Sequence, residues 1–145
     1  MRSGFIETCV DLRVRDDETA VVLSDLIFYD AHSRRHVAPR GFVTDGGSIP
    51  RFFWRIVGAP IRTPYLRAYV IHDHYCAKAQ SISPGDERDA LRLAADRQLR
   101  DETLPACGAS RTVCRYHYRA VRLGARHTRN DPAAPYPVGA VDDSC

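Results

Sequence analysis

The 145-residue sequence has little of what marks a membrane-spanning or exported protein. No apolar run approaches the ~20 residues that cross a bilayer. The first ten residues, MRSGFIETCV, lack the apolar centre of a secretory signal. We therefore expect a soluble, cytoplasmic protein with no membrane span.

Cysteine is scarce and irregularly spaced. The five cysteines stand at positions 9, 76, 107, 114 and 145, and no two of them form a C-x-x-C pair. The odd number and the spacing argue against both a thiolate zinc site and a complete disulfide framework. We expect reduced thiols.

The signatures of several enzyme classes are missing, and so is an excess of one charge. The chain has no Gly-Lys-Ser/Thr phosphate loop, no G-x-S-x-G elbow, no H-E-x-x-H motif and no convincing glycosidase-like carboxylate pair. Its 21 Lys and Arg residues against 18 Asp and Glu give a net charge of +3. A charge this small does not by itself point to nucleic acid.

The residues that are present predict strands in the first third of the chain. A hydrophobic content of 44% is enough for the core of one domain. Residues 5–14 and 19–29 are rich in β-branched and aromatic residues and are joined by the charged segment RDDE, which predicts a β-hairpin. Residues 36–45, HVAPRGFVTD, predict a third strand with Pro39 at an edge or an irregular point.

The hydrophobic period changes to that of helices near Ser48. Proline, serine and glycine signals predict four helices, over residues 48–57, 63–80, 84–102 and 110–124. The predicted fold class is α+β, with a small N-terminal antiparallel sheet packed against about four helices. Residues 1–125 form the single predicted domain, and the Pro-rich residues 126–145 are predicted to be a mobile tail.

Two groups of charged residues lie on the later predicted helices. Asp96 is four residues from both Arg92 and Arg100, which is typical of a charge ladder on a helix surface. The fourth helix carries arginines at spacings of four, four and three, namely Arg111, Arg115, Arg119 and Arg122. This stripe can bind a polyanion or an acidic partner, although a solvated helix face has the same pattern.

The stretch GFVTDGGSIPRFFW, residues 41–54, predicts a strand that turns into a helix. Asp45 precedes Gly46 and Gly47, and Ser48 is positioned to cap the next helix. Such a turn can hold an anion or a metal ion, with Ser48 and Arg51 as candidate substrate-binding residues. The same residues also suit a purely structural corner, in which Asp45 bonds the turn amides.

A second candidate lies in VIHDHYC, residues 70–76. His72 and Asp73 are both competent ligands for a divalent ion, and His72 shares a helix face with Cys76. Adjacent His and Asp occur in metal-dependent phosphohydrolases of the HD class, which also need an earlier His and a later Asp. His36 and Asp96 are available for those roles, although their spacing does not require it. Alternatively, a buried His72 held by an Asp joins helix to sheet.

These motifs together resemble a known family. The runs LSDLIFYDAHSRRHVAPRGFVTDGGSIPRFFW, AYVIHDHYC, ADRQL and YRAVRLGA are similar to the bacterial and phage domain-of-unknown-function family 1353, over roughly residues 20–125. The order G-F-V-T-D-x-x-S-I-P-R followed by I-H-D carries the resemblance. It implies a phage or prophage context and brings no established function.

Two hypotheses follow. In the first, Asp45, His72 and Asp73 are the catalytic residues and the metal ligands of a small metal-dependent or His/Asp-based hydrolase, with a divalent ion as cofactor and a cell-wall or nucleotide substrate. In the second, the chain is a non-enzymatic phage-particle accessory or a module that binds a phage or bacterial protein. We predict that Asp45 and His72 belong to one site, whether its role is catalytic or structural.

Overall fold

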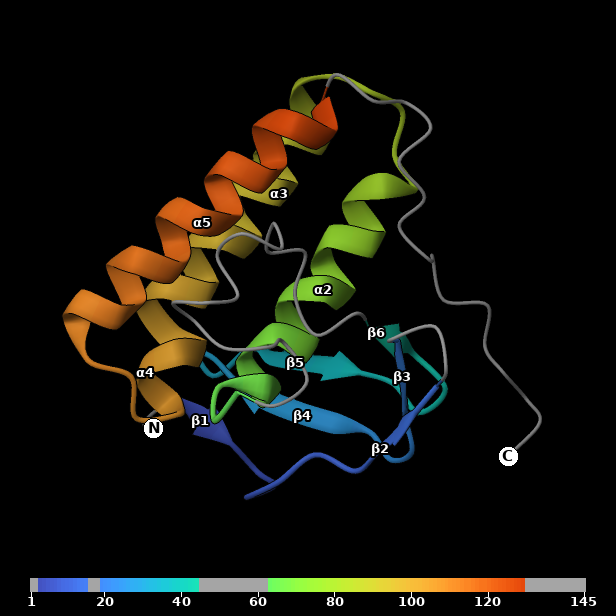
Figure 1. Ribbon diagram of the computed structural model, residues 1–145, viewed down its shortest axis with the longest axis vertical. Coiled ribbons are helices and arrows are strands. Elements are labelled where there is room, and N and C mark those ends of the chain that lie inside the picture. The colour runs from blue at the N-terminus through green and yellow to red at the C-terminus, as the bar shows by residue number, and fades with distance from the viewer. Residues whose placement is uncertain (1–2, 16–18, 45–62, 130–145) are drawn as a thin grey trace.

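The computed structural model describes residues 3–15, 19–44 and 63–129, with side chains to residue 124 in the last range. Short strands gather at one end and helices cover them (Figure 1). This confirms the predicted α+β class. No helix in these ranges is both long enough and apolar enough to cross a membrane.

The predicted single sheet is instead two three-stranded antiparallel sheets, with orders β1-β4-β5 and β2-β3-β6. The strands are β1 (Gly4–Phe5), β2 (Leu12–Val14), β3 (Ala20–Val22), β4 (Leu26–Tyr29), β5 (Arg35–Ala38) and β6 (Val43–Thr44). The predicted hairpin is present. The strands next to its turn, β2 and β3, pair in one sheet, and the strands farther from the turn, β1 and β4, pair in the other. Sequence period alone predicted the strands but not this division.

The division follows from the break between β5 and β6. Pro39 lies in this break, as expected for a residue without an amide hydrogen. Gly41 there has a φ of 85°, and its amide donates to the Val22 carbonyl at 2.7 Å. β5 therefore pairs with β4, whereas β6 turns onto β3.

The helices are α2 (Leu66–Gln80), α3 (Asp86–Gln98), the π-helical segment η3 (Leu99–Thr103), α4 (Leu104–Ala106) and α5 (Arg111–Arg129). The third predicted helix is present, but it widens to π geometry just before Pro105, which offers no amide to the preceding turn. α5 passes Gly124 and continues to Arg129, into the segment predicted as a tail. The predicted helix over residues 48–57 and the rest of the tail, residues 130–145, lie outside the described residues.

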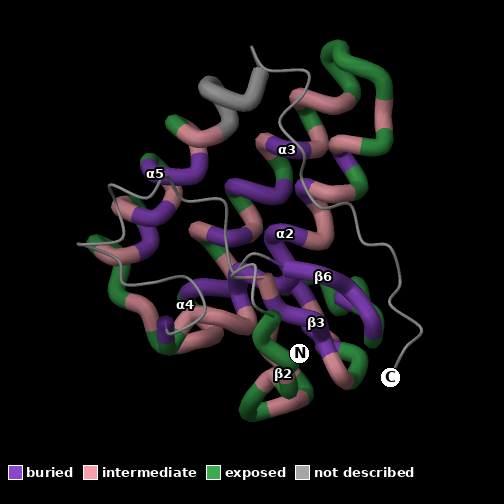
Figure 2. The backbone as a smooth tube through the Cα atoms, turned by 45° about the vertical axis from the view of Figure 1, so that its right-hand side comes forward, coloured by how far each residue is buried: buried purple, intermediate pink, exposed green. Residues whose placement is uncertain are grey.

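α2 lies between the strands and the other helices and is buried along most of its length (Figures 1 and 2). Val70 and Ile71 pack into a core with the sheet residues Leu26 and Phe28. Ala68 and Tyr69 belong to a second core with residues of η3, α4 and α5. Because α2 has apolar neighbours on both sides, its polar residues His72 and Asp73 are buried too.

Candidate functional site

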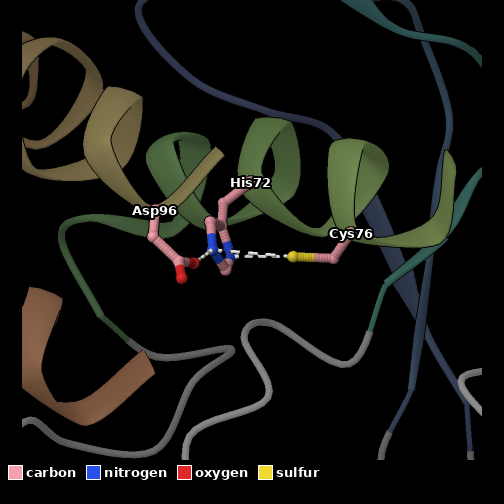
Figure 3. Close-up of side chains that lie close together, drawn as sticks. All are labelled: His72, Cys76 and Asp96. Carbon is pink, nitrogen blue, oxygen red and sulfur yellow. Dashed lines mark hydrogen bonds and ion pairs between the residues drawn. The ribbon is translucent and has the colours of Figure 1, made fainter. Parts of the chain in front are cut away.

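His72 and Cys76 of α2 meet Asp96 of α3 (Figure 3). His72 Nε2 lies 2.7 Å from Asp96 Oδ1 and 3.6 Å from Cys76 Sγ. One potential ligand atom from each residue lies within 4.8 Å of the other two. All three residues are buried, with at most 4% of their surface exposed. A thiol, an imidazole and a carboxylate thus converge in the interior.

The local helix geometry explains this convergence. Residues four apart lie one above the other on a helix, so His72 and Cys76 share the face predicted from their spacing. α3 packs against the same helix after the chain turns at residues 81–85. This packing brings Asp96 to His72.

The predicted surface ladder for Asp96 is wrong. Asp96 is 2% exposed, and Arg92 is also buried. Arg100 pairs with Asp101 instead, at 2.6 Å. The i,i+4 pattern is the same for a surface pair and for a buried polar residue, so only the packing of α3 separates the two cases.

Arg122 of α5 also contacts Asp96. Its Nη1 donates to Asp96 Oδ2 at 2.7 Å, and its side chain is 32% exposed. Arg122 is therefore directed to the interior and is not part of an open stripe. Arg111, Arg115 and Arg119 of the predicted stripe are exposed.

The charges of this cluster support one another. Burial alone would lower the pKa of His72, but the neighbouring Cys76, Asp73 and Asp96 outweigh it and raise this pKa well above its ordinary value. Burial would also raise the pKa of Asp96, but His72 and Arg122 lower it. The pair is therefore most stable as an imidazolium and a carboxylate.

Asp73 approaches His72 from the other side. Its Oδ2 accepts a hydrogen bond from the Thr44 hydroxyl at 2.5 Å, and its Oδ1 lies 3.7 Å from His72 Nδ1. Oδ1 is buried and has no hydrogen-bond partner within the described part of the chain. A buried carboxylate oxygen without a donor is costly, so this atom marks a place where a further interaction is expected.

Thr44 ends β6 and directly precedes Asp45 in the chain. The contact between Thr44 and Asp73 thus joins the strand end to the His-Asp pair, one residue from each member of the predicted Asp45–His72 site. Asp45, Ser48 and Arg51 themselves lie outside the described residues.

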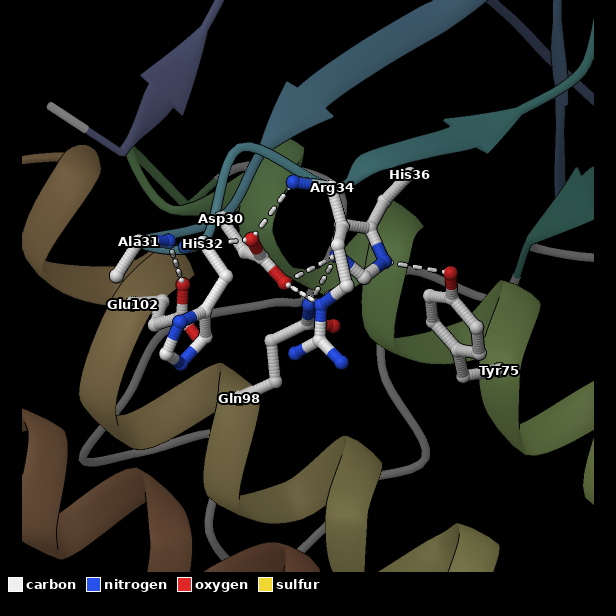
Figure 4. A network of polar contacts seen from close by, with 8 residues as sticks. All are labelled: Asp30, Ala31, His32, Arg34, His36, Tyr75, Gln98 and Glu102. Atoms are coloured by element: carbon white, nitrogen blue, oxygen red, sulfur yellow. Dashed lines mark hydrogen bonds and ion pairs between the residues drawn. The ribbon is translucent and has the colours of Figure 1, made fainter. Parts of the chain in front are cut away.

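His36 belongs to a second polar network (Figure 4). Its Nδ1 lies 2.6 Å from the Tyr75 hydroxyl and its Nε2 lies 3.1 Å from Asp30 Oδ2, while the Gln98 amide is also close. His36 therefore contacts Asp30, in the turn after β4, and Tyr75 of α2. It does not contact the metal-ligand candidates, as the HD-class pattern would need. Sequence reasoning passed over Asp30, Tyr75 and Gln98.

Asp30 is the centre of this network and holds the turn between β4 and β5. Its Oδ1 accepts the amides of His32 and Arg34, and its Oδ2 accepts Arg34 Nε at 2.6 Å. Burial would raise the pKa of Asp30, but these bonds and His36 lower it strongly. The turn contains Ser33 at a φ of 61°, an uncommon conformation for a residue with a side chain. In the sequence, the D-x-x-x-R segment formed by Asp30 and Arg34 between two predicted strands could have indicated this turn.

The donor set of the first cluster fits a divalent transition-metal ion. Imidazole nitrogen, thiolate sulfur and carboxylate oxygen are all ligands of Zn²⁺. With the usual bond lengths, a tetrahedral ion would separate N from S by about 3.6 Å and N from O by about 3.3 Å. The N–S distance already has this value, and the N–O pair at 2.7 Å would open by roughly 0.6 Å.

The fold, two small antiparallel sheets against a helical layer with a His-Cys-Asp cluster between α2 and α3, defines an α+β protein with a buried polar centre. Residues 20–121 match the family described as "Protein of unknown function (DUF1353)", and the chain belongs to this family. It is also 45% identical over 53 residues to the "Uncharacterized protein y4jT" of Sinorhizobium fredii. That match covers 37% of this chain and 16% of the relative's length. No solved structure matches the chain.

Proposed function

We propose that this protein is a small metal-dependent hydrolase whose divalent ion is held by His72, Cys76 and Asp96. The observation that carries the proposal is the convergence of these three ligand types from two helices in the interior. The sequence predicted Asp45, His72 and Asp73 as metal ligands. The present proposal keeps His72 and takes Cys76 and Asp96 as the other two ligands.

Asp73 supports the same arrangement. A histidine that binds a metal through one ring nitrogen usually donates the other N–H to a carboxylate, which fixes the ring and strengthens the ligand. If Nε2 of His72 binds the ion, Nδ1 faces the unpartnered Oδ1 of Asp73 at 3.7 Å. Asp73 is thus proposed to orient His72, and Thr44 to hold Asp73 in place.

His72, Cys76 and Asp96 would hold the ion, and an ion held by three protein ligands would supply a water of lowered pKa as the nucleophile. Asp45, which follows Thr44 in the chain, is proposed to take the proton of this water or to complete the ligand set. Ser48 and Arg51 are proposed to bind the substrate. A phage or prophage context and a cell-wall or nucleotide substrate remain part of the proposal and rest on the sequence resemblance.

The metal centre is tested by elemental analysis of protein purified without chelator, followed by replacement of the ion with Co²⁺. We expect one ion per chain and a sulfur-to-cobalt charge-transfer band. Cys76→Ala should abolish this band. Cys114→Ala is the matched control, because Cys114 is also a buried free thiol but lies on α5, in the core cluster that contains Tyr69. Parent protein that binds no ion under these conditions would rule out the metal centre.

The catalytic step is tested separately with bis(p-nitrophenyl) phosphate and with peptidoglycan as substrates. Hydrolysis should disappear with a chelator and return with Zn²⁺. Asp45→Asn keeps the shape of the side chain but removes its charge, so activity should fall with little change in melting temperature. A clearly lowered melting temperature, together with no metal in the parent protein, would favour a structural role for Asp45.

A second candidate is the non-enzymatic module, and the contacts of Asp96 favour it. Asp96 joins His72 of α2 to Arg122 of α5, so the cluster also ties three helices together. In this case the buried residues stabilise a scaffold, and a phage or bacterial protein binds elsewhere on the surface. A parent protein whose melting temperature is insensitive to chelator and Zn²⁺ would support this candidate.

A further inference from the structure

An arginine-lined cavity lies where η3, α4 and the start of α5 meet. It has a volume of about 510 Å³, and its lining includes Arg100, Asp101, Pro105, Arg111, Cys114 and Arg115. Arg115 and Arg122 are seven residues apart on α5, or roughly 10 Å along the helix axis. The cavity is therefore separate from the His72 cluster that Arg122 contacts.

Of the three arginines in the cavity lining, Arg100 pairs with an acidic residue, and Arg111 and Arg115 have no ion pair within the described residues. Arg100 forms a two-bond pair with Asp101, at 2.6 and 2.7 Å, and its guanidinium lies 4.5 Å from the centre of the Tyr118 ring. The Asp101 carboxylate is thereby neutralised, and its pKa is lowered, chiefly by Arg100. Three arginines against one aspartate leave a net charge of +2 in the lining.

Arg111 and Arg115 carry this net positive charge. Both are exposed, and no ion pair joins either of them to another residue of the described ranges. They stand four residues apart, so their guanidinium groups lie on the same side of α5. The first turn of α5 has no acidic residue that would compete for them.

We infer that this cavity binds the phosphate group of a small phosphorylated molecule. Planar guanidinium groups match phosphate oxygens with two parallel hydrogen bonds, which makes arginine the usual residue for this anion. The volume lies in the range of small-molecule sites. Pro105 and the buried Cys114 provide an apolar wall for the rest of the ligand. A nucleic-acid strand would instead need a groove that follows its backbone.

The test is an NMR titration with inorganic phosphate and then pyrophosphate, with EDTA present so that no metal at the His72 cluster contributes. Chloride at equal ionic strength is the reference. The Nε–Hε resonances of Arg111 and Arg115 should shift saturably with phosphate and more strongly with pyrophosphate. Shifts no larger than those in chloride would overturn the inference.

Variants locate the site. Arg111→Gln and Arg115→Gln should each weaken pyrophosphate binding by about tenfold or more, because each removes a charge-assisted pair of bonds. Arg119→Gln is the matched control, since Arg119 is an exposed arginine of the same helix outside the cavity lining, and it should leave binding unchanged. Equal losses in all three variants would show a diffuse basic surface and would contradict the cavity.

Binding of a thymidine oligonucleotide distinguishes a phosphate-binding cavity from a nucleic-acid-binding surface along α5. The cavity predicts that it binds no more tightly than pyrophosphate and that Arg119→Gln does not affect it. Tighter oligonucleotide binding that depends equally on Arg111 and Arg119 would identify a nucleic-acid stripe along α5 and would overturn the small-ligand inference.

Discussion

Nε2 of His72 and Oδ1 of Asp96 are 2.7 Å apart, although 24 residues separate them in the chain. Both residues are buried, and Arg122 contacts the second carboxylate oxygen. The free energy of burying these charges is offset only while all three are present.

Asp96→Asn should destabilise the protein by about 3–5 kcal/mol, because it leaves His72 and Arg122 without their carboxylate. Urea denaturation measures the change in the free energy of unfolding. Asp101→Asn is the control, since it breaks the more exposed pair with Arg100 and should cost at most about 1 kcal/mol. Similar small losses in both variants would mean that Asp96 is not a buried charge centre.

Thr44→Val should cost about 1–3 kcal/mol, because Oδ2 of Asp73 loses the hydroxyl that donates to it. Thr103→Val is the contrasting variant. Its hydroxyl is buried without a partner in the described part of the chain, so the isosteric valine should leave stability unchanged or raise it. Thermal unfolding of the two variants should therefore differ in sign or by a clear margin. If metal binds, Thr44→Val should also weaken its affinity by about 10–100-fold.

The stability of the parent protein should fall as the pH decreases from about 6.5 to 4. Burial lowers the pKa of His117 from 6.5 to about 4, where its Nδ1 contacts the Tyr69 hydroxyl. In this window the unfolded chain takes up a proton on His117 and the folded chain does not, so protonation favours unfolding. For a shift of this size His117 contributes roughly 3 kcal/mol to the loss.

His117→Gln isolates this contribution. The difference in the free energy of unfolding between parent and variant should shrink as the pH falls through the window and level off below about pH 4. Urea denaturation at half-unit pH intervals measures it. A difference that stays constant across the window would show that His117 titrates alike in both states.

Asp30→Asn should loosen the turn between β4 and β5, since a neutral amide cannot accept the same set of bonds from His32, Arg34 and His36. Amide hydrogen exchange at His32 and Arg34 should accelerate. Asp25→Asn provides the comparison, because Asp25 accepts one exposed bond, from the Arg40 amide. Exchange rates at the turn that match those of the parent would contradict the role of Asp30.

Much of the fold follows from local sequence. The alternation of apolar residues predicted the strands, Pro and Gly marked the starts of α2 and α3, and Ser110 marked the start of α5, where its hydroxyl accepts the Val113 amide. The shared helix face of His72 and Cys76 also follows from spacing alone. These features depend on contacts between near neighbours, which the sequence specifies directly.

Only the tertiary structure decided which distant residues meet. Asp96 has the same spacing to arginines whether α3 turns it outward or inward, and the packing of α3 between α2 and α5 places it inside. Arg122 is not part of the predicted arginine stripe for the same reason, because the packing of α3 against α5 brings it to Asp96. The division into two sheets depends on the bend at Gly41, and the pairing of Thr44 with Asp73 depends on where β6 ends against α2. Each of these contacts joins segments far apart in the chain, and local periodicity carries no information about such distances.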